Sequence, residues 1–353
     1  MIKSANAFSP SGISSFFEIG DTMPDSSPIL DSEKVGMHAD DQLVMKRARA
    51  FSPSGISSFF QICDTEPNGK PITNPERIGA RGGGFALKKG VWTEVEVAKS
   101  DVKKVQVYIN NKYAREAQTT RTVVDIFLEK VNEPKIVTVR HRVEVPIGAG
   151  FGTSGGGALC TALALNYALN MHLTYSELGR IAHVAEVKCR TGLGTVSGLL
   201  FGGCVIVKEP GAPDNGAVER IPVPLSYHIV AGVFQRRLTK EFLESTEKRR
   251  VISIIGQETL RKILAQPSLE NFMQVSRKFA EKTGLATDRV LKLMDEAEEA
   301  GAVGAAQNML GEAVHALVER DKVKSVFKAF KRFLPRNKIV VAEICPYGTQ
   351  LIT

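Results

Sequence analysis

The sequence lacks the features that mark membrane-spanning, secreted and zinc-binding proteins. Among its 353 residues, no apolar run reaches the roughly 18 residues that a membrane span requires. Residues 1–25 contain neither a continuous apolar core nor a small-residue cleavage site, so we expect no secretory signal. The five cysteines form no C-x-x-C pair, which predicts free thiols in a reducing compartment. We therefore expect a cytoplasmic protein without disulfides or a zinc site.

The composition is that of an ordinary globular protein, with 43% hydrophobic, 24% charged and 7% aromatic residues. These proportions exclude collagen-like, low-complexity and disordered chains, and the length predicts two domains. The net charge of +8 suits an anionic partner. Lys and Arg are spread along the chain without interleaved aromatics, so charge alone does not select that partner, and we expect neither nucleic-acid nor membrane binding. The densest basic stretch, residues 322–338, predicts a docked amphipathic helix with a solvated basic face.

A repeat occupies the beginning of the chain. Residues 7–17 recur without change as residues 50–60. A sheet has one position for a given first strand, so the two copies would compete for it. We predict that the second copy is built into the fold and that residues 1–44 form an appended, poorly anchored extension.

Short strands and helices are mixed from residue 46 onward. The hydrophobic patterns predict strands at 90–98, 105–109, 135–145, 203–207, 227–233 and 339–344. They predict helices at 155–169, 176–187, 240–247, 256–265, 269–282, 287–300 and 311–320. The Pro- and Gly-rich residues 209–216 predict a hinge or a surface loop. Because the elements do not alternate as regular βαβ units, the expected fold class is α+β.

Residues 145–159 are the most informative segment. A strand ends at Pro146, six glycines follow within 148–157, and an Ala- and Leu-rich helix begins near Gly155. Glycine permits positive φ angles and close backbone approach to a ligand, and a helix start offers free N–H groups to an anion. A plain capped turn would not require so many glycines, which cost conformational entropy, so we predict phosphate binding. Ser154, at the helix start, is either an N-cap or a ligand of phosphate-bound magnesium.

Three kinds of phosphate loop are distinguished by the residues around their glycines. The G-x-x-x-x-G-K-[ST] loop is absent because no Lys follows these glycines. Residues 150–155 satisfy G-x-G-x-x-G, but the region near His172 offers no strand ending in an acid for a ribose, so a dinucleotide-dependent oxidoreductase is a distant alternative. The pattern Pro-x-Gly-x-Gly-x-Gly-[Ser/Thr]-Ser, followed by small residues, resembles the nucleotide loop of the GHMP small-molecule kinases.

Further segments resemble the archaeal pantoate kinases within the GHMP kinases. They are residues 50–60, 183–187, 191–196, 202–203, 210–211, 272–285 and 307–311. The resemblance covers most of residues 46–353 and implies the GHMP kinase fold, with an N-terminal ribosomal-protein-S5-like domain at 45–220 that holds the nucleotide and a C-terminal ferredoxin-like domain at 221–353. It also implies ATP-dependent phosphorylation of pantoate to 4-phosphopantoate, a step towards coenzyme A, with Mg²⁺ as cofactor. A homodimer is left open.

The resemblance assigns the nucleotide and the metal to particular residues. The ATP phosphates would lie on the loop at Pro146, Gly148, Gly150, Gly152, Thr153, Ser154, Gly155 and Gly156. Mg²⁺ would be held by Ser154 and Glu186, because a hydroxyl and a carboxylate suit a hard cation. Glu186 lies in an apolar helical run, and the alternative is a buried acid paired with Lys188 or Arg190. His183, one turn earlier, is expected to be a packed helix residue.

The substrate side departs from the family pattern at two positions. Thr195 follows Gly-Leu-Gly where relatives typically carry an Asp that acts as a base. A threonine hydroxyl is no general base near neutral pH, so we predict that Thr195 is a catalytic residue that orients the substrate hydroxyl. Lys208, where the family tends to carry an Arg, is predicted to be catalytic and substrate-binding, although it loses the bidentate fork. Ser54 and Arg81 are predicted substrate contacts, as is Thr239, whose alternative role is an N-cap.

Several functional hypotheses therefore remain open. The leading one is a cytoplasmic pantoate kinase that uses MgATP. Its rivals are a GHMP kinase for another small hydroxy acid or alcohol and a catalytically silent nucleotide-binding homologue, for which Thr195 would be the signature. The third glycine motif of the family is reduced here to residues 301–306, and its contribution to the site is left open.

Overall fold

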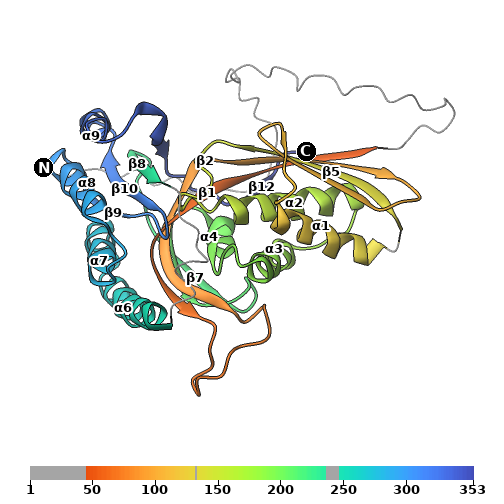
Figure 1. Cartoon of the computed structure of the whole chain (residues 1–353), viewed down its shortest axis with the longest axis horizontal. Helices are drawn as coiled ribbons and strands as arrows, with labels where there is room; N and C mark the ends of the chain where they lie inside the picture. Colours follow the sequence, from red (N-terminus) through yellow and green to blue (C-terminus); the bar gives the residue numbers. More distant parts are fainter. Residues whose placement is uncertain (1–44, 132, 236–245) are drawn as a thin grey trace, which may run out of the picture. The chain divides into compact units, whose positions relative to one another are not determined.

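The computed structural model describes residues 45–131, 133–235 and 246–353. They belong to one compact unit. The predicted extension at residues 1–44 lies outside the described residues and stays a prediction (Figure 1).

A long antiparallel hairpin forms the backbone of the first sheet. Strands β1 (Lys46–Cys63) and β2 (Gly79–Lys99) pair along their whole length, with bulges after Pro53 and Ser57. Residues 50–60, the second copy of the repeat, lie inside β1, as predicted.

Six further strands complete this eight-stranded sheet, whose main path runs β12-β1-β2-β5-β3-β4 while β6 pairs with β2 and β7. They are β3 (Lys104–Ile109), β4 (Lys112–Tyr113), β5 (Lys135–Val143), β6 (Cys204–Glu209), β7 (Ala217–Ile221) and β12 (Gln350–Leu351). Only the β3–β5 pair is parallel among the strand pairs in the described part of the sheet. This is not the parallel sheet of a dinucleotide-binding fold, so the oxidoreductase alternative is wrong.

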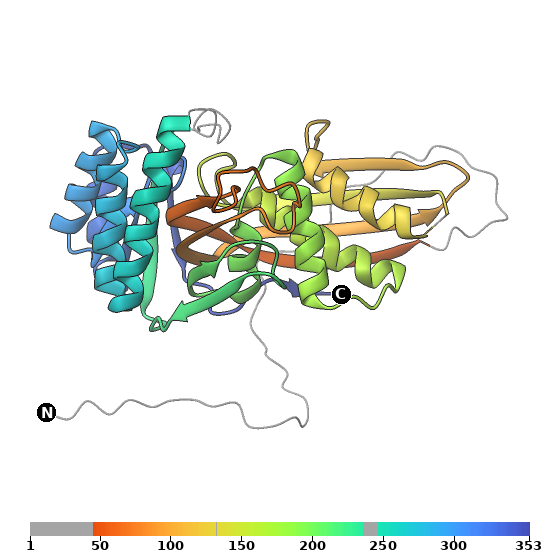
Figure 2. The ribbon, with the colours of Figure 1, turned by 90° about the horizontal axis from the view of Figure 1, so that it is seen from below.

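Four helices cover one face of this sheet (Figures 1 and 2). They are α1 (Gln118–Val131), α2 (Thr153–Leu169), α3 (Tyr175–Cys189) and α4 (Thr195–Phe201). Helix α2 is apolar on almost every side, which is typical of a helix enclosed by other elements. It packs against β1, β2, α1 and α3, and its buried Ala and Leu side chains form the centre of this layer.

A second, four-stranded antiparallel sheet has the order β11-β8-β10-β9. Its strands are β8 (Tyr227–Gln235), β9 (Gly304–Gln307), β10 (Glu312–Glu319) and β11 (Ile339–Glu343). The accompanying helices are α6 (Thr246–Ala265), α7 (Leu269–Lys282), α8 (Asp288–Glu299), α9 (Val323–Phe330) and the short 3₁₀ helix η1 (Arg336–Lys338). In both views α6, α7 and α8 stand side by side (Figures 1 and 2).

The two sheets share a hydrophobic core. Phe59 of β1 and Phe85 of β2 pack edge-to-face on Phe272 of α7, with ring centroids 5.9 and 5.3 Å apart. The predicted domain boundary at 220/221 falls between β7 and β8, yet β12, from the C-terminal end, returns to pair with β1. The division at that boundary stays a prediction.

Several predictions of local structure can be compared with these elements. The helix predicted at 311–320 is wrong, because these residues form β10, which pairs with β8 and β9 on its two sides. Its side chains from Ala313 to Val318 are all buried, and a short run that is buried on both faces has no periodicity that distinguishes strand from helix. Residues 209–216 join the paired strands β6 and β7, so they form a loop within one sheet and not a hinge.

Two other expectations, on the basic stretch and on the cysteines, are confirmed. In the basic stretch, α9 buries Val326, Ala329 and Phe330 while its lysines are exposed, although the helix ends at Phe330. All five cysteines are free thiols. Among the described helices, none combines the length and the apolar character needed to cross a bilayer.

Candidate active site

The glycine-rich loop connects β5 to α2 and uses its glycines in two ways. Gly148, Gly150 and Gly152 have φ angles of 75°, 79° and 59°, in the left-handed region that side chains with a Cβ rarely adopt. Their alternating spacing therefore fits the turn that the sequence predicts. Gly152 is the N-cap of α2 and provides no side-chain cap, so the first-turn amides of this helix are left without a side-chain acceptor.

The next three glycines permit close packing at the start of α2. A Cβ at Gly155 would lie 2.9 Å from Oε2 of Glu186, one at Gly156 would lie 3.3 Å from Ser52 Oγ, and one at Gly157 would lie 3.4 Å from the ring of His141. All six glycines thus have conformational or packing reasons in the fold. Their number alone is not an argument for a phosphate, and the case for a ligand depends on the polar groups around them.

The carboxylate of Glu186 is the most unusual of these polar groups. Glu186 lies on α3 and is only 2% exposed. Its Oε1 accepts a hydrogen bond from Thr191 Oγ1 at 3.3 Å, whereas its buried Oε2 has no hydrogen-bond partner. Burial raises the pKa of Glu186 to about 7. Within the described residues it forms no ion pair with Lys188 or Arg190, so the alternative of a buried salt bridge is not observed.

Ser154 directly precedes Gly155, the position that adjoins Oε2 of Glu186, and its role as a metal ligand stays a prediction. It is the second residue of α2 and not its N-cap, so that alternative is wrong. Its Oγ donates to Thr119 Oγ1 at 3.2 Å. In the described chain no group of three or more His, Cys, Asp or Glu side chains could hold a metal ion. One hydroxyl and one carboxylate fit a Mg²⁺ ion that takes its other ligands from phosphates and water.

Thr195 is the first residue of α4 and lies at the junction of the loop with β1 and α2. Its Cγ2 would be 2.6 Å from a Cβ at Gly152 and 3.7 Å from one at Gly55. The fold therefore brings Thr195 to the glycine-rich loop, where the sequence places it. Ser54, next to Gly55, is buried, and its hydroxyl donates to the main-chain oxygen of Lys89 at 2.6 Å.

Arg81 and Lys208 lie on the neighbouring strands β2 and β6. Arg81 donates to the main-chain oxygen of Lys208 at 2.9 Å and to Glu209 at 2.8 Å. Lys208 Nζ lies 3.3 Å from a carboxylate oxygen of Glu219. A Cβ at Gly194, just before Thr195, would lie 3.2 Å from the carbonyl of Ala80, so this strand end adjoins the start of α4. Both cations thus have acidic partners.

The structure tests the prediction for His183 but not the one for Thr239. His183 is buried, and its Nε2 lies 2.8 Å from the carbonyl oxygen of Ile78, which confirms a packed helix residue. Thr239 lies outside the described residues, so its role as a substrate contact stays a prediction.

The turn between β9 and β10 also contacts the loop, and its residues were not predicted as site residues. A Cβ at Gly150 would lie 3.0 Å from Asn308 Cβ and 3.1 Å from the carbonyl of Met309. The contribution of residues 301–306, the reduced third glycine motif of the family, was left open, and the turn at 308–311 is the part next to β9 that reaches the loop. The signal was present, since residues 307–311 resemble the pantoate kinases.

A buried histidine supports this turn from behind. His315 Nδ1 donates to Asn308 Oδ1 at 2.9 Å, and its Nε2 lies 2.8 Å from Ser58 Oγ. Burial lowers the pKa of His315 to about 3, so the ring is neutral and can accept from Ser58. The turn is thereby fixed to β1 and β10.

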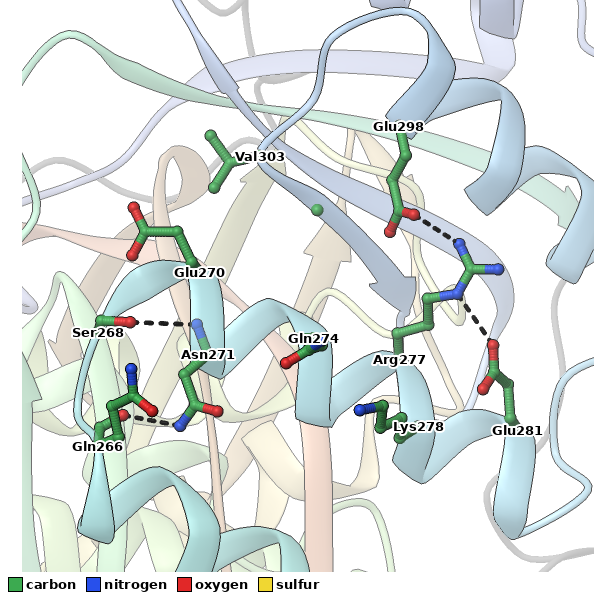
Figure 3. A pocket seen from close by; sticks show the side chains of 11 residues that line it. Gln266, Ser268, Glu270, Asn271, Gln274, Arg277, Lys278, Glu281, Glu298 and Val303 are labelled. Atoms are coloured by element: carbon green, nitrogen blue, oxygen red, sulfur yellow. Dashed lines mark hydrogen bonds and ion pairs between the residues drawn. The ribbon is translucent and has the colours of Figure 1, made fainter.

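A pocket of about 560 Å³ lies elsewhere, along α7 and beside β9 (Figure 3). None of the predicted site residues lines it. Its Arg277 forms ion pairs with Glu281 and Glu298, as Figure 3 shows, and also with Asp295, so its charge is already neutralised. This pocket is therefore not the candidate active site.

Comparison with known proteins places this geometry in a family. The family model for the GHMP kinases N terminal domain matches residues 118–203, which include the loop, Glu186 and Thr195. The pantoate kinase of Methanocaldococcus jannaschii is 37% identical over 188 residues, which cover 53% of this chain and 67% of that protein. The pantoate kinase of Thermococcus kodakarensis is 33% identical over 254 residues, which cover 69% of this chain and 82% of that protein.

A solved structure shows the same architecture. It is described as a phosphotransferase related to the CoA biosynthesis pathway, and it superimposes with a TM-score of 0.77 at 28% identity, covering 86% of this chain and 98% of that chain. The expected α+β class and GHMP kinase fold are confirmed by this agreement and by the family model. The chain belongs to the pantoate kinase family of the GHMP kinases.

Proposed function

We propose that the protein transfers the γ-phosphoryl group of ATP to the hydroxyl of pantoate, which gives 4-phosphopantoate and ADP on the route to coenzyme A. Its similarity to two pantoate kinases over 67% and 82% of their lengths supports this substrate. The observation in this chain that carries the proposal is the unpartnered Oε2 of Glu186 beside Ser154, at the uncapped start of α2.

The triphosphate would be held mainly by main-chain groups. The first-turn amides of α2, from Thr153 to Gly155, have no intrahelical acceptor, and the partial positive charge of the helix start favours an anion. The positive φ angles of Gly150 and Gly152 turn the preceding backbone into the same loop. Phosphoryl transfer depends chiefly on positioning and charge stabilisation, which such a loop can supply.

Ser154 and Glu186 would hold the Mg²⁺ that accompanies ATP. When bound, this ion neutralises negative charge that develops on the transferred phosphoryl group. The chain contributes an acid whose burial is costly without a cation, and a hydroxyl fixed beside it. A cation would also favour the ionised form of Glu186, whose pKa is raised without it.

Thr195, Arg81 and Lys208 would act on the pantoate side. The Thr195 hydroxyl, at the edge of the loop, would orient the attacking hydroxyl group. Because no carboxylate stands at this position, the departing proton would pass to water or to a phosphate oxygen. Arg81 and Lys208 would attract the pantoate carboxylate, which has to compete with Glu219 for Lys208. Ser54 and Thr239 stay proposed substrate contacts, and a cytoplasmic location stays a prediction.

The proposal is tested by following ADP release from the purified full chain with MgATP and a panel of hydroxy acids and alcohols that includes pantoate and homoserine. We expect turnover that depends on pantoate, and a phosphate monoester of pantoate by ³¹P NMR. Turnover with another acceptor but not with pantoate would show that the proposed substrate is wrong.

One observation favours a second candidate, a nucleotide-binding homologue without catalysis. Thr195 provides no general base, and such help is typically worth about 10²–10⁴-fold in rate. Calorimetric binding of MgATP without turnover on any acceptor of the panel would support this candidate.

A further inference from the structure

Four hydroxyl and carboxyl groups form a hydrogen-bonded chain next to the loop. Ser154 Oγ on α2 donates to Thr119 Oγ1 on α1 at 3.2 Å. The hydroxyls of Thr119 and Thr191 are 3.0 Å apart, and Thr191 Oγ1 donates to Glu186 Oε1 at 3.3 Å. Thr191 lies in the turn that directly follows α3, so these hydrogen bonds join three segments: α1, α2 and α3 with its following turn.

The direction of this chain follows from the number of protons. Each hydroxyl has one proton to donate and two lone pairs. The carboxylate of Glu186, which a bound cation would keep ionised, only accepts, so Thr191 donates to it, and Thr119 must then donate to Thr191. Ser154 donates its single proton to Thr119, which leaves the lone pairs of Ser154 free for a cation.

At the Glu186 end of this hydrogen-bonded chain, one carboxylate oxygen is free. Thr191 occupies Oε1 of Glu186, while the buried Oε2 has no partner. Oε2 lies between two glycines, since a Cβ at Gly155 would be 2.9 Å from it and one at Gly192 would be 2.4 Å from it. No larger residue fits at either position without a shift, so the fold keeps this oxygen uncovered by side chains on both sides.

We propose that Thr119 and Thr191 are positioning residues for the magnesium of MgATP. They fix the Ser154 hydroxyl and the Glu186 carboxylate so that the lone pairs of Ser154 and Oε2 of Glu186 both face the cation. This inference rests on the proposed function. It adds two residues that contact neither the metal nor the nucleotide and that act through the two predicted ligands.

Thr122 provides a matched control on the same helix. It is half-buried, three residues from Thr119, and its Oγ1 lies 3.3 Å from Cys189 Sγ, outside the chain to Glu186. The substitutions Thr119→Val, Thr191→Val and Thr122→Val each replace a hydroxyl by a methyl group. Thr119→Ser and Thr191→Ser keep the hydroxyl and serve as the rescuing variants.

The test measures ATP binding by calorimetry with Mg²⁺ and with EDTA, and the Mg²⁺ concentration that gives half-maximal turnover. Residues that orient metal ligands typically contribute roughly 10–100-fold to metal affinity. We expect Thr119→Val and Thr191→Val to weaken MgATP binding by roughly this factor, leave binding in EDTA unchanged and require more Mg²⁺ for turnover. Thr122→Val and the two serine variants should behave as the wild type.

Two outcomes would overturn the inference. One is wild-type MgATP affinity and Mg²⁺ requirement in both valine variants. The other is an equal loss of binding with Mg²⁺ and with EDTA, which would indicate a purely structural role. Failure of the wild-type chain to bind MgATP would instead contradict the proposed function, so the two failures are distinguishable.

Discussion

At the scale of the residue, Glu186 and Thr195 determine what the site can do. The sequence predicted Glu186 as a metal ligand from its place in a family motif, and the structure adds that its carboxylate is buried with one oxygen unpartnered. That orphaned oxygen could not be predicted, because it depends on how Gly155 of α2 packs against α3. The role of Thr119 could not be predicted either, because it is distant in sequence from Ser154, from whose hydroxyl it accepts a hydrogen bond.

Substitution of Thr195 tests whether its hydroxyl orients the substrate. We expect Thr195→Ala to lower kcat while the KM for ATP stays near the wild-type value, because the loop amides are untouched. Thr195→Ser keeps the hydroxyl and should retain most of the activity. Steady-state kinetics with MgATP and pantoate measure both values, and full kcat in the alanine variant would contradict the assigned role.

At the scale of the element, the glycine-rich loop shows both the strength and the limit of sequence reasoning. The alternation of Gly148, Gly150 and Gly152 predicted a turn with positive φ, and this is confirmed. The partner of the loop was not predicted, since the contacting turn at 308–311 precedes a strand that the pattern assigned to a helix. A run buried on both faces, such as β10, takes its conformation from the strands on either side of it, and local sequence does not record them.

The substitution Gly152→Ala tests the conformation of the loop. The left-handed backbone costs a residue with a Cβ roughly 1–2 kcal/mol, and here the new methyl would also meet Thr195 Cγ2 at 2.6 Å. We therefore expect lower stability in urea unfolding together with weaker MgATP binding.

Gly69→Ala is the matched control for this change. Gly69 also has a positive φ, of 82°, but a Cβ there would meet nothing within 4 Å. It should lose comparable stability from backbone strain and keep wild-type MgATP binding. Equal loss of binding in the two variants would show that the effect of Gly152→Ala is not local to the site.

At the scale of the whole molecule, the fold class and the GHMP architecture were predictable because one motif and several scattered segments agreed with a single family. The packing that joins the two sheets was not predictable from the sequence, since Phe59, Phe85 and Phe272 come from segments far apart in the sequence. The return of β12 to the first sheet is likewise a long-range pairing that no local pattern encodes.

The buried histidines predict how the stability of the whole molecule depends on pH. Burial lowers the pKa of His141 to about 4 and that of His315 to about 3, from an ordinary value of 6.5. The unfolded chain therefore binds more protons than the folded one below pH 6.5, and stability falls as pH decreases, by up to about 1.4 kcal/mol per pH unit for each histidine. Glu186 has the opposite effect, because its raised pKa of about 7 makes the folded state bind a proton first.

Urea unfolding at several pH values between 7 and 5 measures this balance. We expect a net loss of stability towards pH 5, and a steeper loss in Glu186→Gln, which removes the opposing carboxyl group. A flat profile in both the wild type and Glu186→Gln would mean that these histidines are not buried in their neutral form.

The central claim is that the loop and Glu186 together hold MgATP, and calorimetric titration of MgATP tests it most directly. The variant Glu186→Gln is compared with Glu129→Gln, which changes an exposed acid on α1. The account predicts binding by the wild type and by the control, and a loss in Glu186→Gln that exceeds the roughly 10–100-fold effect of residues that only orient a ligand. No heat with the wild type at millimolar MgATP, or wild-type affinity in Glu186→Gln, would contradict it.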